Sequence, residues 1–230
     1  NGAMPAVLAG HSLGEWSALV CAGTVQFEDA VGIVRSRGAL MQDAVPVGIG
    51  AMAAIIGLDD ESICQSCADA RGDEVVDAVN FNAPGQVVIA GSADAVGRAI
   101  ELCKAAGAKR ALPLPVSAPF HTSLMAPAAE RLTEQVRSVT FSAPEIPVIH
   151  NVHGQSESDP AVIKKLMLEQ IYSPVRWVDC VLELRRRGAE QFVECGPGRV
   201  LSGLSKRINR EIVSFSTDDV ASLKNALAAV

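Results

Sequence analysis

The stretch VLAGHSLGEWSAL (residues 7–19) places Ser12 between Gly10 and Gly14. The apolar run before the serine predicts a short strand, and the residues after it predict a helix that ends near Gly23. A Gly-x-Ser-x-Gly pattern at a strand-to-helix turn is typical of a nucleophile elbow, in which the serine hydroxyl projects from the top of a sheet. Without a strand before it and a helix after it, the same pattern is often only a helix cap.

The composition predicts an ordinary soluble globular protein. The chain has 230 residues, of which 49% are apolar and 20% are charged, and its formal net charge is −6. Acidic and basic residues are mixed along the sequence, so we expect no nucleic-acid partner. No apolar run reaches the roughly 20 residues that a bilayer crossing needs, and the first residues do not resemble a signal peptide. We therefore expect a cytoplasmic protein with no membrane partner.

Six cysteines are scattered through the sequence, many within apolar periodic segments, and this predicts reduced core thiols. Cys64 and Cys67 form a C-x-x-C pair on a predicted helix. Because no second pair lies at ligand spacing, the pattern favours packing over a zinc or redox site. We expect no metal.

The order of predicted elements divides the protein into two parts. Residues 48–116 give the order β-α-β-β-α-β, which is typical of a ferredoxin-like unit and indicates an inserted subdomain. In residues 1–47 and 117–230, strands alternate with helices, which predicts a parallel sheet covered by helices on both faces. The predicted fold class is therefore α/β.

A serine nucleophile needs a base, and histidine is the usual one. The sequence offers four histidines, and His121 in VSAPFHTSL follows a predicted strand end and precedes a helix, where α/β folds display catalytic groups. His11 is adjacent to Ser12 and is better placed for packing, while structural or exposed roles are the default for His150 and His153. We choose His121 as the base.

Arg37 lies on the apolar face of a predicted helix over residues 26–42, a face marked at seven-residue intervals by Phe27, Val34 and Met41. A guanidinium on such a face is costly unless a carboxylate meets it. That carboxylate could be internal, for example Glu15 or Asp43. It could instead belong to a substrate whose other end reaches Ser12.

With these residues in place, the sequence resembles the malonyl-CoA:acyl carrier protein transacylases and, more distantly, the acyltransferase domains of polyketide synthases. The resemblance rests on segments in family order over essentially the whole sequence: GHSLGEWSAL, RSRGALMQ, NAPGQVVIAG, PFHTSLM, SPVRW and ECGPGRVLSGL. It implies an α/β-hydrolase-like catalytic domain over residues 1–47 and 117–230, with a ferredoxin-like insert over residues 48–116.

The resemblance also implies roles for single residues. Ser12 would be the acylated nucleophile, His121 the general base and then acid, and Arg37 the anchor for the malonyl carboxylate. The Leu13 amide would be one oxyanion donor, and a backbone carbonyl at Gln170 would orient His121.

The resemblance further implies two pocket residues. Phe120 would exclude an α-methyl group and so favour malonyl over methylmalonyl, and Met41 would line the same pocket.

The implied reaction moves a malonyl group from malonyl-CoA through a serine ester to the phosphopantetheine thiol of acyl carrier protein, in fatty acid or polyketide synthesis. It requires no cofactor, and we expect a monomer. Two alternatives stay open from the residues: a serine esterase or thioesterase, and a catalytically impaired module that only binds carrier protein.

Family members carry an upstream strand and a loop with a second oxyanion amide, and the loss of one oxyanion donor costs about 100-fold or more in rate. We therefore expect residues 1–230 alone to be catalytically weak or insoluble.

Overall fold

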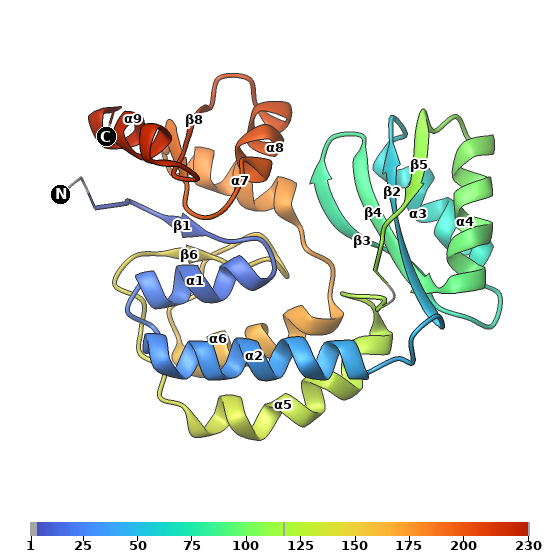
Figure 1. Cartoon of the computed structure of the whole chain (residues 1–230), viewed down its shortest axis with the longest axis horizontal. Coiled ribbons are helices and arrows are strands. Elements are labelled where there is room, and N and C mark those ends of the chain that lie inside the picture. Colours follow the sequence, from blue (N-terminus) through green and yellow to red (C-terminus); the bar gives the residue numbers. More distant parts are fainter. Residues whose placement is uncertain (1–3, 117, 230) are drawn as a thin grey trace.

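The computed structural model describes residues 4–116 and 118–229 and has two lobes (Figure 1). The small lobe is continuous in sequence and comprises β2 (Gly50–Ile56), α3 (Asp60–Arg71), β3 (Val76–Ala83), β4 (Gln86–Ser92), α4 (Ala93–Ala105) and β5 (Arg110–Pro113). The large lobe begins with β1 (Leu8–Ala9), α1 (Leu13–Cys21) and α2 (Phe27–Asp43). It continues with η1 (Ser123–Met125), α5 (Ala126–Ser138), β6 (Val148–Ile149), α6 (Pro160–Glu169), η2 (Gln170–Tyr172), α7 (Trp177–Arg186), β7 (Gln191–Glu194), α8 (Val200–Ile208), β8 (Val213–Ser216) and α9 (Val220–Ala229).

The small lobe is a four-stranded antiparallel sheet in the order β3-β4-β2-β5, which confirms the ferredoxin-like unit. Alternate residues of its strands enter two different cores, as the two-residue period of a strand requires. Ile55 and Ile89 pack under α3 and α4, whereas Met52 and Val88 form a second cluster on the other face. Phe120 from the large lobe packs against that second cluster.

The described strands of the large lobe form two short parallel pairs, β1 with β6 and β7 with β8. The sequence predicted a parallel sheet covered by helices on both faces. The short length of β1 and β6 has a local cause. Gly10 begins the elbow directly after β1, and the backbone turns at 151–154 directly after β6. Helices α1, α2, α5 and α6 bury their apolar faces in one core beside this pair.

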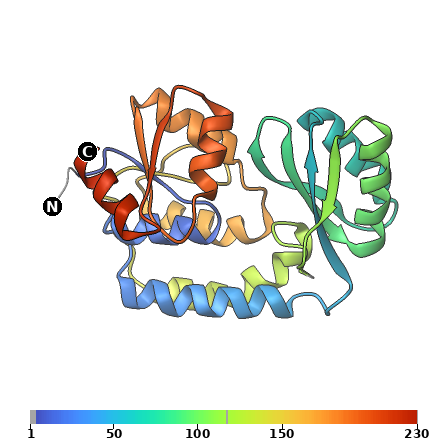
Figure 2. The ribbon, with the colours of Figure 1, turned by 45° about the horizontal axis from the view of Figure 1, so that its top comes forward.

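Helix α2 buries Ala30, Ile33, Arg37 and Met41, a stripe with helical spacing. The prediction that Phe27 shares this face is wrong, because Phe27 is the first residue of the helix and is 64% exposed. Two seven-residue intervals shift the position by only about 40° around a straight helix, so periodicity does not explain the difference. Phe27 lies in the first turn, where burial depends on what lies beyond the helix end. Figure 2 shows α2 running along the large lobe toward the small lobe, into which its C-terminal end leads.

The two lobes are joined by backbone hydrogen bonds as well as by the covalent connections between them. Val175 N–H donates to Val79 O at 2.8 Å, and Phe81 N–H donates to Val175 O at 3.0 Å, so β3 pairs locally with the segment before α7. The predicted domain boundary near residue 47 precedes β2, while residue 117 lies outside the described residues. None of the described helices is long and apolar enough to cross a bilayer.

Candidate active site

Ser12 occupies the turn between β1 and α1 with φ 52° and ψ −105°, a conformation that L-residues rarely adopt. The turn is tight because β1 and α1 meet closely. A Cβ atom added to Gly10 would lie 2.0 Å from the carbonyl carbon and oxygen of Gly14, whereas a Cβ added to Gly14 would meet nothing within 4 Å. Of the two glycines that flank Ser12, only Gly10 is therefore required on steric grounds.

Two buried amide side chains hold the backbone of the elbow. Ser12 N–H donates to Asn151 Oδ1 at 2.7 Å, and Asn151 Nδ2 donates to Gly10 O at 2.7 Å. Gln170 Nε2 donates to Ser12 O at 3.0 Å. Each of these polar groups of the strained turn thus has a fixed partner from a distant part of the sequence.

The hydroxyl of Ser12 lies 2.9 Å from His121 Nε2. His121 Nδ1 donates to Gln170 O at 2.8 Å, and because a carbonyl can only accept, Nε2 is left free to take a proton from Ser12. His121 also has a positive φ of 65°. Burial and the nearby Arg37 cation lower its pKa to about 3, so the imidazole is neutral at neutral pH.

Arg37 is 5% exposed, and its Nη2 donates both to Ser12 Oγ and to Gln170 Oε1, each at 3.0 Å. Burial lowers its pKa to about 10, which leaves the guanidinium charged at neutral pH. Neither internal candidate meets it directly, since Glu15 pairs with His150 and Asp43 is exposed. Within the described part of the protein, Arg37 Nε has no hydrogen-bond partner.

The other predicted site residues lie next in sequence to Ser12 and His121, or one helical turn from Arg37. Leu13 is the first residue of α1, so its N–H is one of those that no carbonyl within the helix can accept. Phe120 directly precedes His121, is half-buried, and packs against the cores of both lobes. Met41 is 3% exposed in the core of the large lobe, one turn beyond Arg37.

Comparison with known proteins places the chain in a family. The acyl transferase domain family matches residues 1–223. The malonyl CoA-acyl carrier protein transacylase of Salmonella typhimurium is 53% identical over 227 residues, which cover 99% of this chain and 74% of that protein. The chain belongs to the malonyl CoA-acyl carrier protein transacylase family.

Solved structures of the transacylase family have the same fold. An acyl carrier protein S-malonyltransferase from Vibrio cholerae superimposes with a TM-score of 0.96 at 57% identity, covering 97% of this chain and 73% of that one. A malonyl-transacylase in complex with its type II PKS acyl-carrier protein superimposes with a TM-score of 0.98 at 50% identity, covering 100% and 74%. The α/β fold with a ferredoxin-like unit is thus that of the transacylases.

The remaining histidines do not contact the Ser12 hydroxyl. His11 Nε2 lies 2.8 Å from Asn82 Oδ1 of the small lobe, and its ring packs on Trp177. His150 is fully buried and its Nδ1 lies 2.7 Å from Glu15 Oε1, while His153 Nδ1 accepts from a neighbouring backbone N–H. Burial lowers the pKa of His11.

Three residues that support the site were not predicted in that role from the sequence: Glu15, His150 and Asn151. Glu15 appeared only as a possible partner of Arg37, and His150 only as a structural or exposed imidazole. The sequence carried one signal for Asn151: it lies two residues after β6, near the carboxyl end of a parallel strand, where α/β folds place functional side chains.

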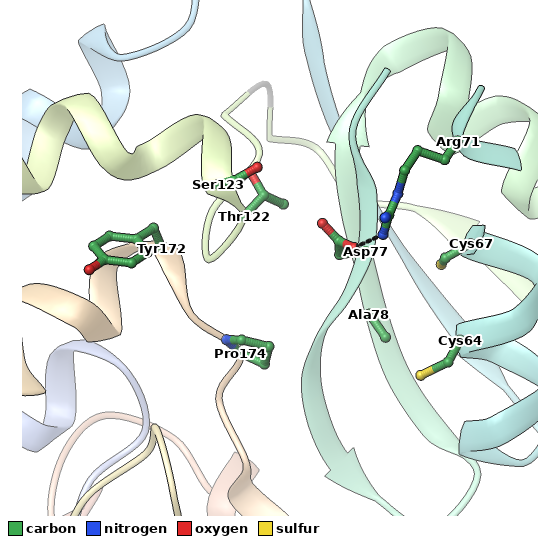
Figure 3. Close-up of a pocket in the computed structure, with 9 residues that line it drawn as sticks. All are labelled: Cys64, Cys67, Arg71, Asp77, Ala78, Thr122, Ser123, Tyr172 and Pro174. Atoms are coloured by element: carbon green, nitrogen blue, oxygen red, sulfur yellow. Dashed lines mark hydrogen bonds and ion pairs between the residues drawn. The ribbon is translucent and has the colours of Figure 1, made fainter. Parts of the chain in front are cut away.

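Cys64 and Cys67 lie one turn apart on α3 and line a cavity of about 380 Å³ between the lobes (Figure 3). The cavity adjoins Thr122 and Tyr172 but is lined by none of Ser12, His121 and Arg37. Burial raises the pKa of both thiols, that of Cys67 to about 12, so neither is an activated nucleophile. No cluster of metal-ligating side chains occurs in residues 4–116 and 118–229.

Proposed function

We propose that the protein transfers a malonyl group from malonyl-CoA, through an ester on Ser12, to the phosphopantetheine thiol of an acyl carrier protein. One observation carries the proposal: Ser12 Oγ lies within hydrogen-bond distance of both a neutral imidazole, His121, and a buried cation, Arg37. The names of the relatives support it, as does the structural neighbour bound to its acyl-carrier protein.

In the first half-reaction, Ser12 Oγ attacks the thioester carbonyl carbon while its proton passes to His121 Nε2. The negative charge that develops on the carbonyl oxygen is stabilised by donors at the start of α1, including the Leu13 N–H. The C–S bond then breaks, the coenzyme A sulfur takes the proton from His121, and malonyl-Ser12 remains.

In the second half-reaction, the phosphopantetheine thiol gives its proton to His121 Nε2 and its sulfur attacks the ester carbonyl. The ester C–O bond breaks, and Ser12 Oγ recovers the proton from His121. The hydrogen bond from His121 Nδ1 to Gln170 O keeps the same tautomer available in both halves. No step needs a cofactor.

Arg37 gives the site its preference for a carboxylated acyl group. Its Nε has no partner among the described residues, so the buried cation has hydrogen-bonding capacity left for a carboxylate. Arg37 Nη2 lies 3.0 Å from Ser12 Oγ, the atom that would carry the acyl group. A carboxylate bound to the Arg37 guanidinium is therefore close to the ester carbonyl, as the short malonyl group requires. Phe120 and Met41 would narrow the same pocket, Phe120 by excluding an α-methyl group.

The proposal extends to organisation and partners. The catalytic domain would comprise residues 1–47 and 117–230, with the insert over 48–116, and the protein would act as a monomer with acyl carrier protein as its protein partner.

The test is a panel of acyl-CoA thioesters assayed for transfer to carrier protein and for release of the free acid. We expect transfer of malonyl in preference to acetyl and methylmalonyl groups, with little free malonate. Release of malonate faster than its transfer would instead identify a thioesterase, which shares Ser12 and His121 but has no need of Arg37.

A further inference from the structure

Glu15 is a fully buried carboxylate directly behind the elbow, and within the described residues its only ion-pair partner is His150. Burying a carboxylate is costly unless several donors satisfy it. Glu15 has three. His150 Nδ1 lies 2.7 Å from Oε1, while Oε2 accepts from Asn151 N–H at 3.1 Å and from Gln170 Nε2 at 2.7 Å.

Two of these donors belong to residues that themselves hold the reacting groups. Asn151 uses its side chain to bind Ser12 N–H and Gly10 O. Gln170 binds Ser12 O and Arg37 with its side chain, and His121 with its backbone carbonyl. Through these contacts Glu15 is linked to the strained elbow, to the base and to the cation.

The amide of Gln170 stands between a buried carboxylate and a buried guanidinium. Its Nε2 donates to Glu15 Oε2 at 2.7 Å, and its Oε1 accepts from Arg37 Nη2 at 3.0 Å. Because an amide has one accepting and one donating end, Glu15 fixes which end faces Arg37. Glu15 also favours the charged form of Arg37, since it raises the pKa of the guanidinium against the effect of burial.

We propose that Glu15 is a positioning residue for the acyl transfer: through its hydrogen bond to Gln170 it orients Arg37 toward the acyl group without touching the guanidinium. A carboxylate in direct contact would neutralise Arg37, and the substrate would have to displace it. With the amide as spacer, the guanidinium stays charged, oriented and free to bind a substrate carboxylate. This inference rests on the proposed function.

The test replaces Glu15 and compares malonyl with acetyl transfer. Glu15→Met keeps much of the side-chain volume but leaves only a weak hydrogen-bond acceptor. Glu15→Asp shortens the side chain, and it keeps the proposal testable if the methionine variant does not fold. Misorientation of a binding group commonly costs about 10- to 100-fold. We expect kcat/KM for malonyl-CoA to fall by about that factor more than kcat/KM for acetyl-CoA, with the smaller change in Glu15→Asp.

Glu15→Gln serves as the conservative variant. Its carbonyl oxygen can still accept from Asn151 and Gln170, and His150 can accept from the new amide by moving its ring proton to Nε2, which has no partner among the described residues. We expect its malonyl preference to stay within about threefold of that of the unchanged protein. Loss of the preference in Glu15→Gln would overturn the proposal.

Two controls separate positioning from stability. Glu183 is also a buried carboxylate, paired with Arg186 and Arg187 away from the site, so Glu183→Gln should lower the Tm without changing the malonyl preference. In an Arg37→Ala background, Glu15→Met should change malonyl and acetyl transfer by the same factor, because the residue through which it acts is absent.

Equal loss of malonyl and acetyl transfer in Glu15→Met and Glu15→Asp, measured well below their Tm, would show that Glu15 only supports the fold. If the unchanged protein itself did not prefer malonyl to acetyl, the proposed function would fail instead.

Discussion

Replacing Arg37 by alanine should convert a malonyl-selective enzyme into one that barely distinguishes malonyl from acetyl groups. Arg37 is 5% exposed and its guanidinium is charged at neutral pH, so a carboxylate bound to it forms a buried, charge-assisted pair. Removing one partner of such a pair costs about 2–5 kcal/mol, which corresponds to roughly 30- to 5,000-fold in kcat/KM. Acetyl has no carboxylate and gains nothing from the pair.

Some loss is expected for acetyl transfer as well, because Arg37 Nη2 also donates to Ser12 Oγ. One hydrogen bond of a charged donor contributes about 1.5–3 kcal/mol at most, and it affects both substrates alike. The diagnostic quantity is therefore the ratio of the two losses, which cancels this shared contribution.

The assay measures kcat/KM for malonyl-CoA and acetyl-CoA with the same carrier protein, for the unchanged protein and for Arg37→Ala. Arg35→Ala is the matched control, because Arg35 is an exposed arginine on the same helix. We expect the malonyl-to-acetyl ratio to fall by at least about 30-fold in Arg37→Ala and to stay unchanged in Arg35→Ala. Equal loss for both substrates in Arg37→Ala would refute the anchor role.

Three further predictions follow from the geometry. Because the pKa of His121 is lowered to about 3, the imidazole is in its base form at every pH above that value. The rate of Ser12 acylation, measured by rapid quench, should therefore not fall as pH drops from 8 through 6.5 to 5. A pH profile with a midpoint near 6.5 would contradict this. Gly10→Ala should destabilise the protein by about 1–3 kcal/mol or prevent folding, since its Cβ would lie 2.0 Å from backbone atoms, while Gly14→Ala should leave the free energy of unfolding nearly unchanged. Denaturant unfolding compares the two, and equal effects would count against the tight elbow. Cys64→Ser and Cys67→Ala should both retain full transfer activity, because the thiols line a separate cavity and their pKa values are raised; loss of activity in a folded variant would assign them a role.

The sequence contained enough to predict the three residues that meet at the candidate site, because each carries a local signal. Ser12 has its glycine pattern, His121 follows a strand end, and Arg37 is a cation on an apolar helix face. The periodicity argument was right for Arg37 and wrong for Phe27, since burial at the first turn of a helix depends on what lies beyond the helix end.

The supporting residues were harder to predict, because their roles arise only from contacts between distant segments. Glu15 and Gln170 are separated by 155 positions in sequence, and Ser12 and Asn151 by 139. The elbow pattern indicates a strained turn at Ser12, but no local pattern predicts the positive φ at His121. These strained positions are stable because buried amides and carbonyls fix them, which only the folded protein can show.

The most direct test of the account is the chemical identity of the acyl-enzyme. The protein is mixed with malonyl-CoA, quenched in acid and digested, and the peptide that contains Ser12 is analysed by mass spectrometry. The account predicts one malonyl group on Ser12, its loss when carrier protein is added before the quench, and no such group in Ser12→Ala. Malonyl transfer to carrier protein by Ser12→Ala at an undiminished rate, or a malonyl group attached to a different residue on the reaction path, would contradict it.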